Sequence, residues 1–168
     1  IDMEPSPPLR IIGKYKPTLK GRAVGILVTD GADGAMVNAV KSAAEAEGAT
    51  VKIVAPKIGG VTLKGGKKLA ADGQLQGMPS VLFDAVAIVV SDEGCAMLLK
   101  EGAAIDFAND AFGHLKAIGH SSQAMPLLEK AGVEPDAGVI DLSKGAKAFL
   151  KPAATRQWAR EPLVRTLA

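Results

Sequence analysis

The residues best suited to chemistry lie in the stretch 115–125, which is typical of a buried strand that turns sharply into a helix. Several α/β hydrolase-like folds place a nucleophilic Cys or Ser at the tip of such a turn, with a base within hydrogen-bonding reach. The tip residue in this sequence is Gly119, which has no side chain. The sequence therefore predicts a catalytic elbow that lacks its reactive atom.

The neighbours of Gly119 do not replace the missing nucleophile. His120 can serve as a base only beside a nucleophile, and Ser121 and Ser122 come two and three residues after the tip. Cys95 follows another predicted strand, and a lone cysteine is most often a packing residue. We therefore expect no catalytic residue, a degenerate elbow at Gly119, His120 and Ser121, and a possible redox thiol at Cys95.

The elements that must position these residues follow from the periodicity of apolar side chains. The expected strands are 23–29, 50–55, 85–90, 117–119 and 138–141, with a hairpin over 61–69. The expected helices start after the N-cap Asp33, span 105–115 and 125–131, and end the chain at 154–159. Strands that alternate with helices form right-handed crossovers. The sequence thus predicts an α/β fold, a doubly wound, mostly parallel, flavodoxin-like sheet of about five strands between helices in three layers.

In an open α/β sheet, a ligand site lies outside the carboxyl ends of the strands. Three segments are expected there: 30–34, 91–95 and 119–123. They contain carboxylates, hydroxyls, one thiol and one imidazole, which would suffice for a site. The same residue types also cap helices and fill ordinary polar loops, and this structural interpretation is the one we favour.

Composition and motifs exclude several classes of partner. No G-x-G-x-x-G motif follows a strand, aromatic residues make up 4% of the chain, and the two histidines lack metal-ligand spacing. A net charge of +2 with interspersed signs gives no case for nucleic acid, and no apolar run approaches the ~18 residues of a membrane span. We therefore expect no cofactor, metal, nucleic acid or membrane partner for this domain. The single cysteine favours a reducing compartment, which predicts a cytoplasmic location.

Residues 1–22 are expected to form a proline-rich linker, and residues 23–168 one domain. Pro5, Pro7, Pro8 and Pro17 disfavour regular helix in the first segment. A chain of 168 residues suits a single domain, and 48% hydrophobic content is enough for its core. A sequence that starts on a linker is expected to be part of a longer polypeptide.

Residues 23–142 resemble the DJ-1/PfpI branch of the class I glutamine amidotransferase-like proteins. The resemblance depends on residues 31–36, 83–90 and 116–120. Active members carry Cys where this chain has Gly119, followed by a His that matches His120, and they carry Glu where this chain has Met36. Both catalytic positions are substituted, so the resemblance implies the fold without the family's hydrolase, deglycase or protease activity.

Within that branch, the whole chain is similar to the C-terminal domain of large-subunit (clade 2) haem catalases. The similarity extends over the Pro-rich residues 5–9, the basic stretch that ends at 21–22, and the segments 77–86, 111–118 and 156–162. It implies a parent that disproportionates hydrogen peroxide at a haem held in a separate upstream domain. It implies no haem in this domain, because Tyr15 lies in the linker and is not a candidate ligand.

Three functions follow as hypotheses. The first is a non-catalytic domain that stabilises the catalase subunit and its tetramer, with the catalase core and neighbouring subunits as partners. The second is a chaperone-like holdase or partner-binding module, because a mean hydropathy of +0.19 could leave apolar surface exposed to unfolded clients. The third, and least favoured, is a DJ-1/PfpI-type hydrolase or deglycase that works through His120 or Cys95.

Overall fold

A six-stranded sheet forms the centre of the computed structural model, which describes residues 3–4, 6–11 and 13–165. The strands are β1 (Ala23–Val28), β2 (Thr50–Ala55), β5 (Gly73–Gln74), β6 (Ala85–Val89), β7 (Ile118–His120) and β8 (Val139–Asp141). Their order is β5-β2-β1-β6-β7-β8, and every neighbouring pair is parallel. This order confirms the flavodoxin-like prediction, and the two-residue β5 adds a sixth strand at the edge beside β2.

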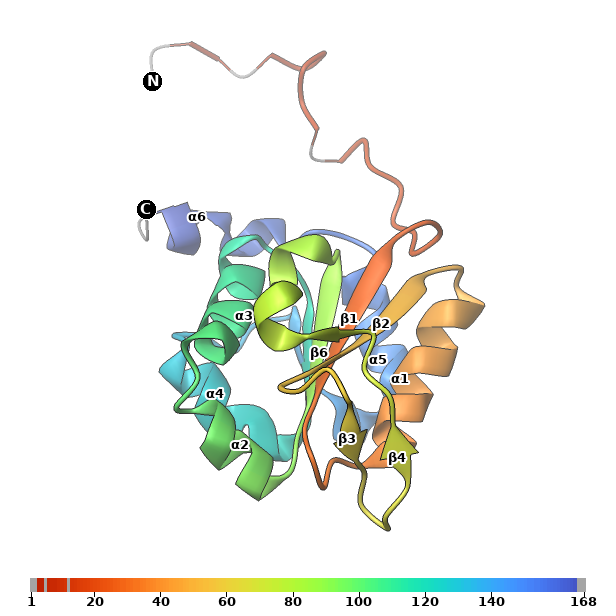
Figure 1. Cartoon of the computed structure of the whole chain (residues 1–168). Helices are drawn as coiled ribbons and strands as arrows, with labels where there is room; N and C mark the ends of the chain where they lie inside the picture. Colours follow the sequence, from red (N-terminus) through yellow and green to blue (C-terminus); the bar gives the residue numbers. More distant parts are fainter. Residues whose placement is uncertain (1–2, 5, 12, 166–168) are drawn as a thin grey trace.

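Helices cover both faces of the sheet and complete the three layers (Figure 1). They are α1 (Gly34–Ala46), α2 (Asp92–Leu98), α3 (Gly102–Gly113), α4 (Met125–Lys130), α5 (Ala146–Ala153) and α6 (Glu161–Val164). The short 3-10 turns are η1 (Leu75–Gly77), η2 (Ser80–Leu82), η3 (Ser122–Ala124), η4 (Leu142–Lys144) and η5 (Trp158–Arg160). Helices α1 and α5 pack on one face, and α2, α3 and α4 pack on the other. Among the described residues, none of these helices has the length and apolar character needed to cross a bilayer.

Strand β1 shows why a continuous apolar run becomes a central strand. Ile26 and Leu27 are both fully buried, but they belong to separate apolar clusters. Ile26 lies in the cluster with Val37 of α1, and Leu27 lies in the cluster with Phe107 of α3. Successive side chains of a strand point to opposite faces, so a strand covered on both sides must be apolar at every position.

Short polar signals set two of the local boundaries. The Asp33 carboxylate accepts hydrogen bonds at the start of α1, and Gly48 with φ +82° follows its end, as the sequence predicts. The expected hairpin is also present: β3 (Val61–Thr62) and β4 (Lys68–Leu69) pair antiparallel. Gly65 lies in the turn between them at φ +88°, a conformation that glycine adopts without steric cost.

The prediction for the C-terminal region was wrong. The sequence indicated a helix over 154–159, but the last substantial helix is α5 (Ala146–Ala153), and a loop follows it before η5. Pro152 lies in the final turn of α5, where its ring removes only one hydrogen bond of an already ending helix. Helix α2 was likewise not predicted; it begins at Asp92, within the segment expected to be a polar loop.

Residues 18–22, which the sequence assigned to the linker, pack onto the domain. The Leu19 side chain is 3% exposed, and the Thr18 N–H donates to the Ala154 carbonyl at 3.2 Å. The residues before Thr18 extend away from the sheet (Figure 1). Four positions of the expected linker and the end of the expected domain lie outside the described residues: Ile1, Asp2, Pro5, Ile12 and residues 166–168.

Candidate functional site

The three segments expected at the carboxyl ends of the strands do meet there, around a pocket of about 440 Å³. Its lining comes from the loops after β1, β6 and β7, and includes Met36 and Ser121. Gly119, His120 and Cys95 do not line this pocket. The sequence therefore located the edge correctly, but the side chains expected to carry its chemistry are not gathered in one cavity.

The polar side chains at this edge hold the loops together. The Asp30 carboxylate accepts a hydrogen bond from the Thr62 N–H at 2.7 Å. The Ser91 hydroxyl donates to the Asp30 carbonyl at 2.6 Å and accepts from the Gly94 N–H at 3.0 Å, which caps α2. These groups satisfy backbone donors and acceptors at strand ends and helix starts, where pairing is obligatory.

Ser121 has a similar structural role. Its residue is 2% exposed, and its hydroxyl accepts from the Val90 N–H at 3.2 Å and donates to the Val90 carbonyl at 3.3 Å. The hydroxyl thus joins the end of β7 to the end of β6. Among the described residues, both hydrogen bonds of this oxygen are to the Val90 backbone and neither is to a base of the kind that activates a serine nucleophile.

Gly119 lies inside β7 and not at the tip of a turn. It pairs with Ala87 of β6 and Ile140 of β8, which keeps its backbone extended, and the turn begins only at Ser121. A Cβ atom at position 119 would lie 2.9 Å from Leu142 Cδ2 and 3.1 Å from a Phe149 ring carbon. A side chain here would therefore point into the apolar layer under α5 and away from the pocket.

His120 and Cys95 are both enclosed. His120 is 7% exposed at the end of β7, and its Nδ1 lies 3.2 Å from the Ser121 carbonyl oxygen. Cys95 is 3% exposed on α2, and burial raises the pKa of its thiol, with the nearby Asp92 charge acting in the same direction. A buried thiol with a raised pKa has little thiolate, which is the reactive form. These surroundings are those of packing residues.

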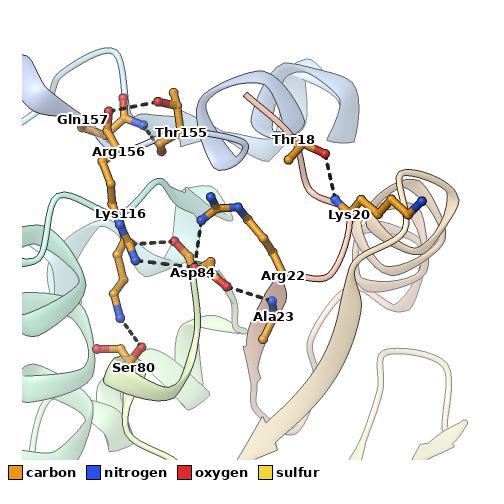
Figure 2. Close-up of polar contacts among 10 residues, drawn as sticks. All are labelled: Thr18, Lys20, Arg22, Ala23, Ser80, Asp84, Lys116, Thr155, Arg156 and Gln157. Atoms are coloured by element: carbon orange, nitrogen blue, oxygen red, sulfur yellow. Dashed lines mark hydrogen bonds and ion pairs between the residues drawn. The ribbon is translucent and has the colours of Figure 1, made fainter. Parts of the chain in front are cut away.

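The opposite, amino-terminal edge of the sheet holds a charged cluster that the sequence analysis missed (Figure 2). Asp84, just before β6, is at its centre. Its carboxylate accepts from Arg22 Nη1 at 3.0 Å and from the Ala23 N–H at 3.0 Å, and Arg156 Nη2 lies 3.5 Å away. Arg156 also donates to the Asp84 carbonyl at 3.1 Å. One carboxylate therefore joins the linker, two central strands and the C-terminal segment.

Lys116, just before β7, is a buried cation beside this cluster. The residue is 3% exposed, and its Nζ donates to the Ser80 carbonyl at 2.7 Å (Figure 2). Burial and, to a lesser degree, the Arg156 charge lower the pKa of Lys116 to about 8, while the charges of Asp84 and Asp110 act against this shift. Keeping the Lys116 ammonium group charged in this buried position makes the free energy of folding less favourable.

Arg160 closes the same edge from the C-terminal side. Its side chain is fully buried and forms two hydrogen bonds to the Asp136 carboxylate, at 2.7 and 2.9 Å. It also donates to the carbonyls of Phe112 and Lys116, and its guanidinium lies 4.1 Å from the centre of the Phe112 ring. Burial alone would raise the pKa of Asp136, but the Arg160 and backbone hydrogen bonds outweigh it and hold that pKa below its usual range.

A sequence signal for this cluster did exist. Arg22, Asp84 and Lys116 each stand within two positions before a predicted apolar strand. The amino ends of parallel strands meet at one edge, so charges placed there are neighbours regardless of their separation in the chain. The analysis looked only at the carboxyl edge, where ligands usually bind, and so did not use this signal.

The side chains that could ligate a haem lie on separate elements of the described structure. Tyr15 is partly exposed and lies under the Arg22 guanidinium at 4.8 Å, His114 is exposed at the end of α3, and His120 is enclosed. None of the three lines the pocket at the carboxyl edge or the pocket beside Trp158. Over the same residues, no group of three or more His, Cys, Asp or Glu side chains could hold a metal ion.

Comparison with known proteins identifies relatives over nearly the whole chain. The family of C-terminal domains found in long catalases matches residues 20–155. The chain is 46% identical to Catalase C of Rhizobium meliloti (strain 1021), over 98% of this chain and 24% of that protein. It is 34% identical to Catalase-1 of Neurospora crassa, over 73% of this chain and 17% of that protein. It is 28% identical to Catalase HPII of Pseudomonas aeruginosa, over 98% of this chain and 24% of that protein. The chain thus spans about a quarter or less of the length of these relatives.

Proposed function

The chain belongs to the family of C-terminal domains found in long catalases, and on that premise we propose that it is a non-catalytic domain that stabilises the subunit and tetramer of such an enzyme. The observation that supports this most directly is that polar side chains at the carboxyl edge form hydrogen bonds to the backbone. The Ser91, Ser121 and Asp30 side chains bond to backbone groups, and the space beside Gly119 is filled by apolar side chains.

The proposed parent disproportionates hydrogen peroxide, as the names of the relatives suggest. Haem bound in the upstream part of that polypeptide supplies this chemistry. We assign no residue of the present chain to it, because Tyr15, His114 and His120 lie on separate elements and outside the pockets at the carboxyl edge and beside Trp158. The contribution of this domain is physical: it adds a folded body with its own apolar core to each subunit.

Removal of residues 20–168 from the full-length polypeptide tests this proposal. We expect freshly purified truncated enzyme to keep its turnover of hydrogen peroxide per haem. We expect its thermal inactivation to be faster and its tetramer to dissociate at a lower urea concentration, measured by sedimentation. An unchanged inactivation rate and an unchanged tetramer would contradict the stabilising role, and a loss of turnover before heating would contradict the non-catalytic role.

We favour the holdase alternative less, because much of the exposed apolar surface is scattered over the domain. Ile58 and Met97, 66% and 41% exposed, lie on separate elements, whereas Val81 and Leu82, 50% and 56% exposed, are adjacent. We expect the chain at equimolar ratio to leave the light scattering of a heat-denatured client unchanged. Methylglyoxal and peptide-hydrolysis assays on the same sample are expected to show no turnover. Turnover lost in Cys95→Ser or His120→Ala would identify an active site and overturn the proposal.

A further inference from the structure

The junction between the linker and the domain, and the C-terminal segment with α6, lie at the amino-terminal edge of the sheet (Figure 1). The linker reaches the domain at Thr18, whose N–H is bonded to the Ala154 carbonyl, and Arg22 then bonds to Asp84. The hairpin of β3 and β4 and the carboxyl-edge pocket lie at the opposite end. Any polypeptide that precedes the linker is therefore tethered next to the amino-terminal edge.

This edge also carries apolar surface and a hollow. Val81 and Leu82 of η2 are 50% and 56% exposed, three and two positions before the central Asp84. A pocket of about 310 Å³ lies between the start of β8 and the C-terminal segment, and its lining includes Phe112 and Trp158. Neighbouring exposed apolar side chains and a partly apolar hollow at one edge of a domain are typical of protein–protein contact surfaces.

We propose that this surface, which comprises Val81, Leu82 and the pocket beside Trp158, docks on the part of its own polypeptide that precedes the linker. The inference depends on the proposed function, because the family places this domain after the rest of a long catalase. The linker makes the contact intramolecular, with an effective concentration on the order of millimolar. A modest apolar interface is therefore sufficient to keep the two parts together.

The place where the linker joins the domain indicates which polypeptide docks on this surface. The preceding polypeptide joins the domain at Thr18, beside the C-terminal segment, while the exposed Ile58 and Met97 belong to the loop after β2 and to α2, which begins at the carboxyl edge. Docking at the amino-terminal edge leaves the carboxyl-edge pocket directed away from the rest of the enzyme. It also buries the partly exposed ion pairs of Asp84, whose side chain is 29% exposed in this chain alone.

The test compares two double variants in the full-length polypeptide. Val81→Asp with Leu82→Asp places carboxylates in the proposed interface, whereas Ile58→Asp with Met97→Asp is a matched change elsewhere. Proteolytic cleavage within residues 3–17 measures how often the domain separates from the rest. We expect the first pair to raise the cleavage rate by roughly tenfold or more. An unpaired carboxylate at an apolar contact lowers the equilibrium constant for docking by roughly tenfold or more. We expect the second pair to leave the rate unchanged.

Hydrogen exchange on the same intact proteins separates undocking from unfolding. Amides of β1 and β6 are expected to stay protected in both double variants, while amides of η2 and of the segment 155–160 lose protection only in the first. Equal cleavage of both variants, or wild-type cleavage of the first, would overturn the proposed surface. Protection of η2 that falls on dilution would assign the surface to a neighbouring subunit and overturn the intramolecular contact. The truncation described above reads out stability separately, so the proposed function can fail or hold independently of this result.

Discussion

At the scale of the residue, Gly119 shows that the sequence gives the type of a residue but not the direction that a side chain at its position would take. Its lack of a side chain is visible in the sequence, and the expected elbow was inferred from the strand-to-helix pattern of residues 115–125 around it. The structure adds that the position faces Leu142 and Phe149 from within β7. Cysteine at this position would therefore enter an apolar layer, where it would lack both a base and access to substrate.

We predict that Gly119→Cys does not create hydrolase or deglycase activity and lowers the free energy of unfolding by roughly 1 to 3 kcal/mol, the usual cost of an overpacked core position. Urea denaturation and a methylglyoxal assay measure the two effects. Gly102→Cys is the matched control, because nothing lies within 4 Å of a Cβ there, and we expect it to be near neutral. Turnover in Gly119→Cys would show that position 119 does reach the pocket.

Lys116 provides a second prediction at this scale. Its pKa in the folded protein is about 8, below the value of 10.5 for a free lysine, so the unfolded chain binds more protons between these two pH values. Stability must then rise with pH across this interval, by up to about 3 kcal/mol from this group. Urea denaturation of wild type and Lys116→Met from pH 7 to 11 is expected to show this rise only in wild type.

The difference between the two proteins isolates Lys116 from other groups. The buried Cys95 thiol has a raised pKa, so its contribution to stability falls as the pH passes its unfolded value, opposite in sign but equal in both proteins. Lys100→Met removes an exposed lysine and is expected to keep the wild-type profile. The same pH profile in Lys116→Met and wild type would show that Lys116 is not desolvated.

At the scale of the element, α5 is the largest feature absent from the predictions. It has only eight residues and contains Pro152, so its periodicity was too short to recognise. In the structure its Phe149 is fully buried in the same apolar cluster as Ile26 and Val37. Tertiary packing of one aromatic face, and not helix propensity, stabilises an element of this length.

We predict that Phe149→Ala lowers the free energy of unfolding by about 3 to 5 kcal/mol, because it leaves a cavity between α5 and β7. Thermal or urea denaturation followed by circular dichroism measures this loss. Lys147→Ala, an exposed change on the same helix, is expected to alter stability by less than about 0.5 kcal/mol. Similar losses in both variants would mean that α5 does not cover the sheet as described.

At the scale of the whole molecule, Asp84 connects segments that are far apart in the sequence. Arg22 is 62 positions before it and Arg156 is 72 positions after it, and both side chains bond to it at one edge. The linker and the C-terminal segment are thus held by the same carboxylate. If this carboxylate is removed, Arg22 and the Ala23 N–H lose it as an acceptor, and Arg156 keeps only its bond to the carbonyl of residue 84.

We predict that Asp84→Ala lowers the free energy of unfolding by about 2 to 3 kcal/mol, the cost of leaving charged and backbone donors partly buried without a partner. Hydrogen exchange is expected to increase most in the segment 155–160. Asp106→Ala, at an exposed position on α3, is the control and is expected to be near neutral. Increased exchange spread evenly over the sheet would indicate general loosening and would contradict a local joint.

The sequence by itself determined five of the six strands of the sheet, the two-sided burial, the flavodoxin-like class and the absence of a nucleophile at Gly119. These features depend on local periodicity and residue identity, which a linear pattern contains. Only the tertiary structure decided that Gly119 faces α5, that Ser91 and Ser121 serve the backbone, and that Asp84 joins both ends of the domain. The physical reason is that these contacts join residues from different strands and loops. They exist only once the order of the strands brings their ends together at one edge.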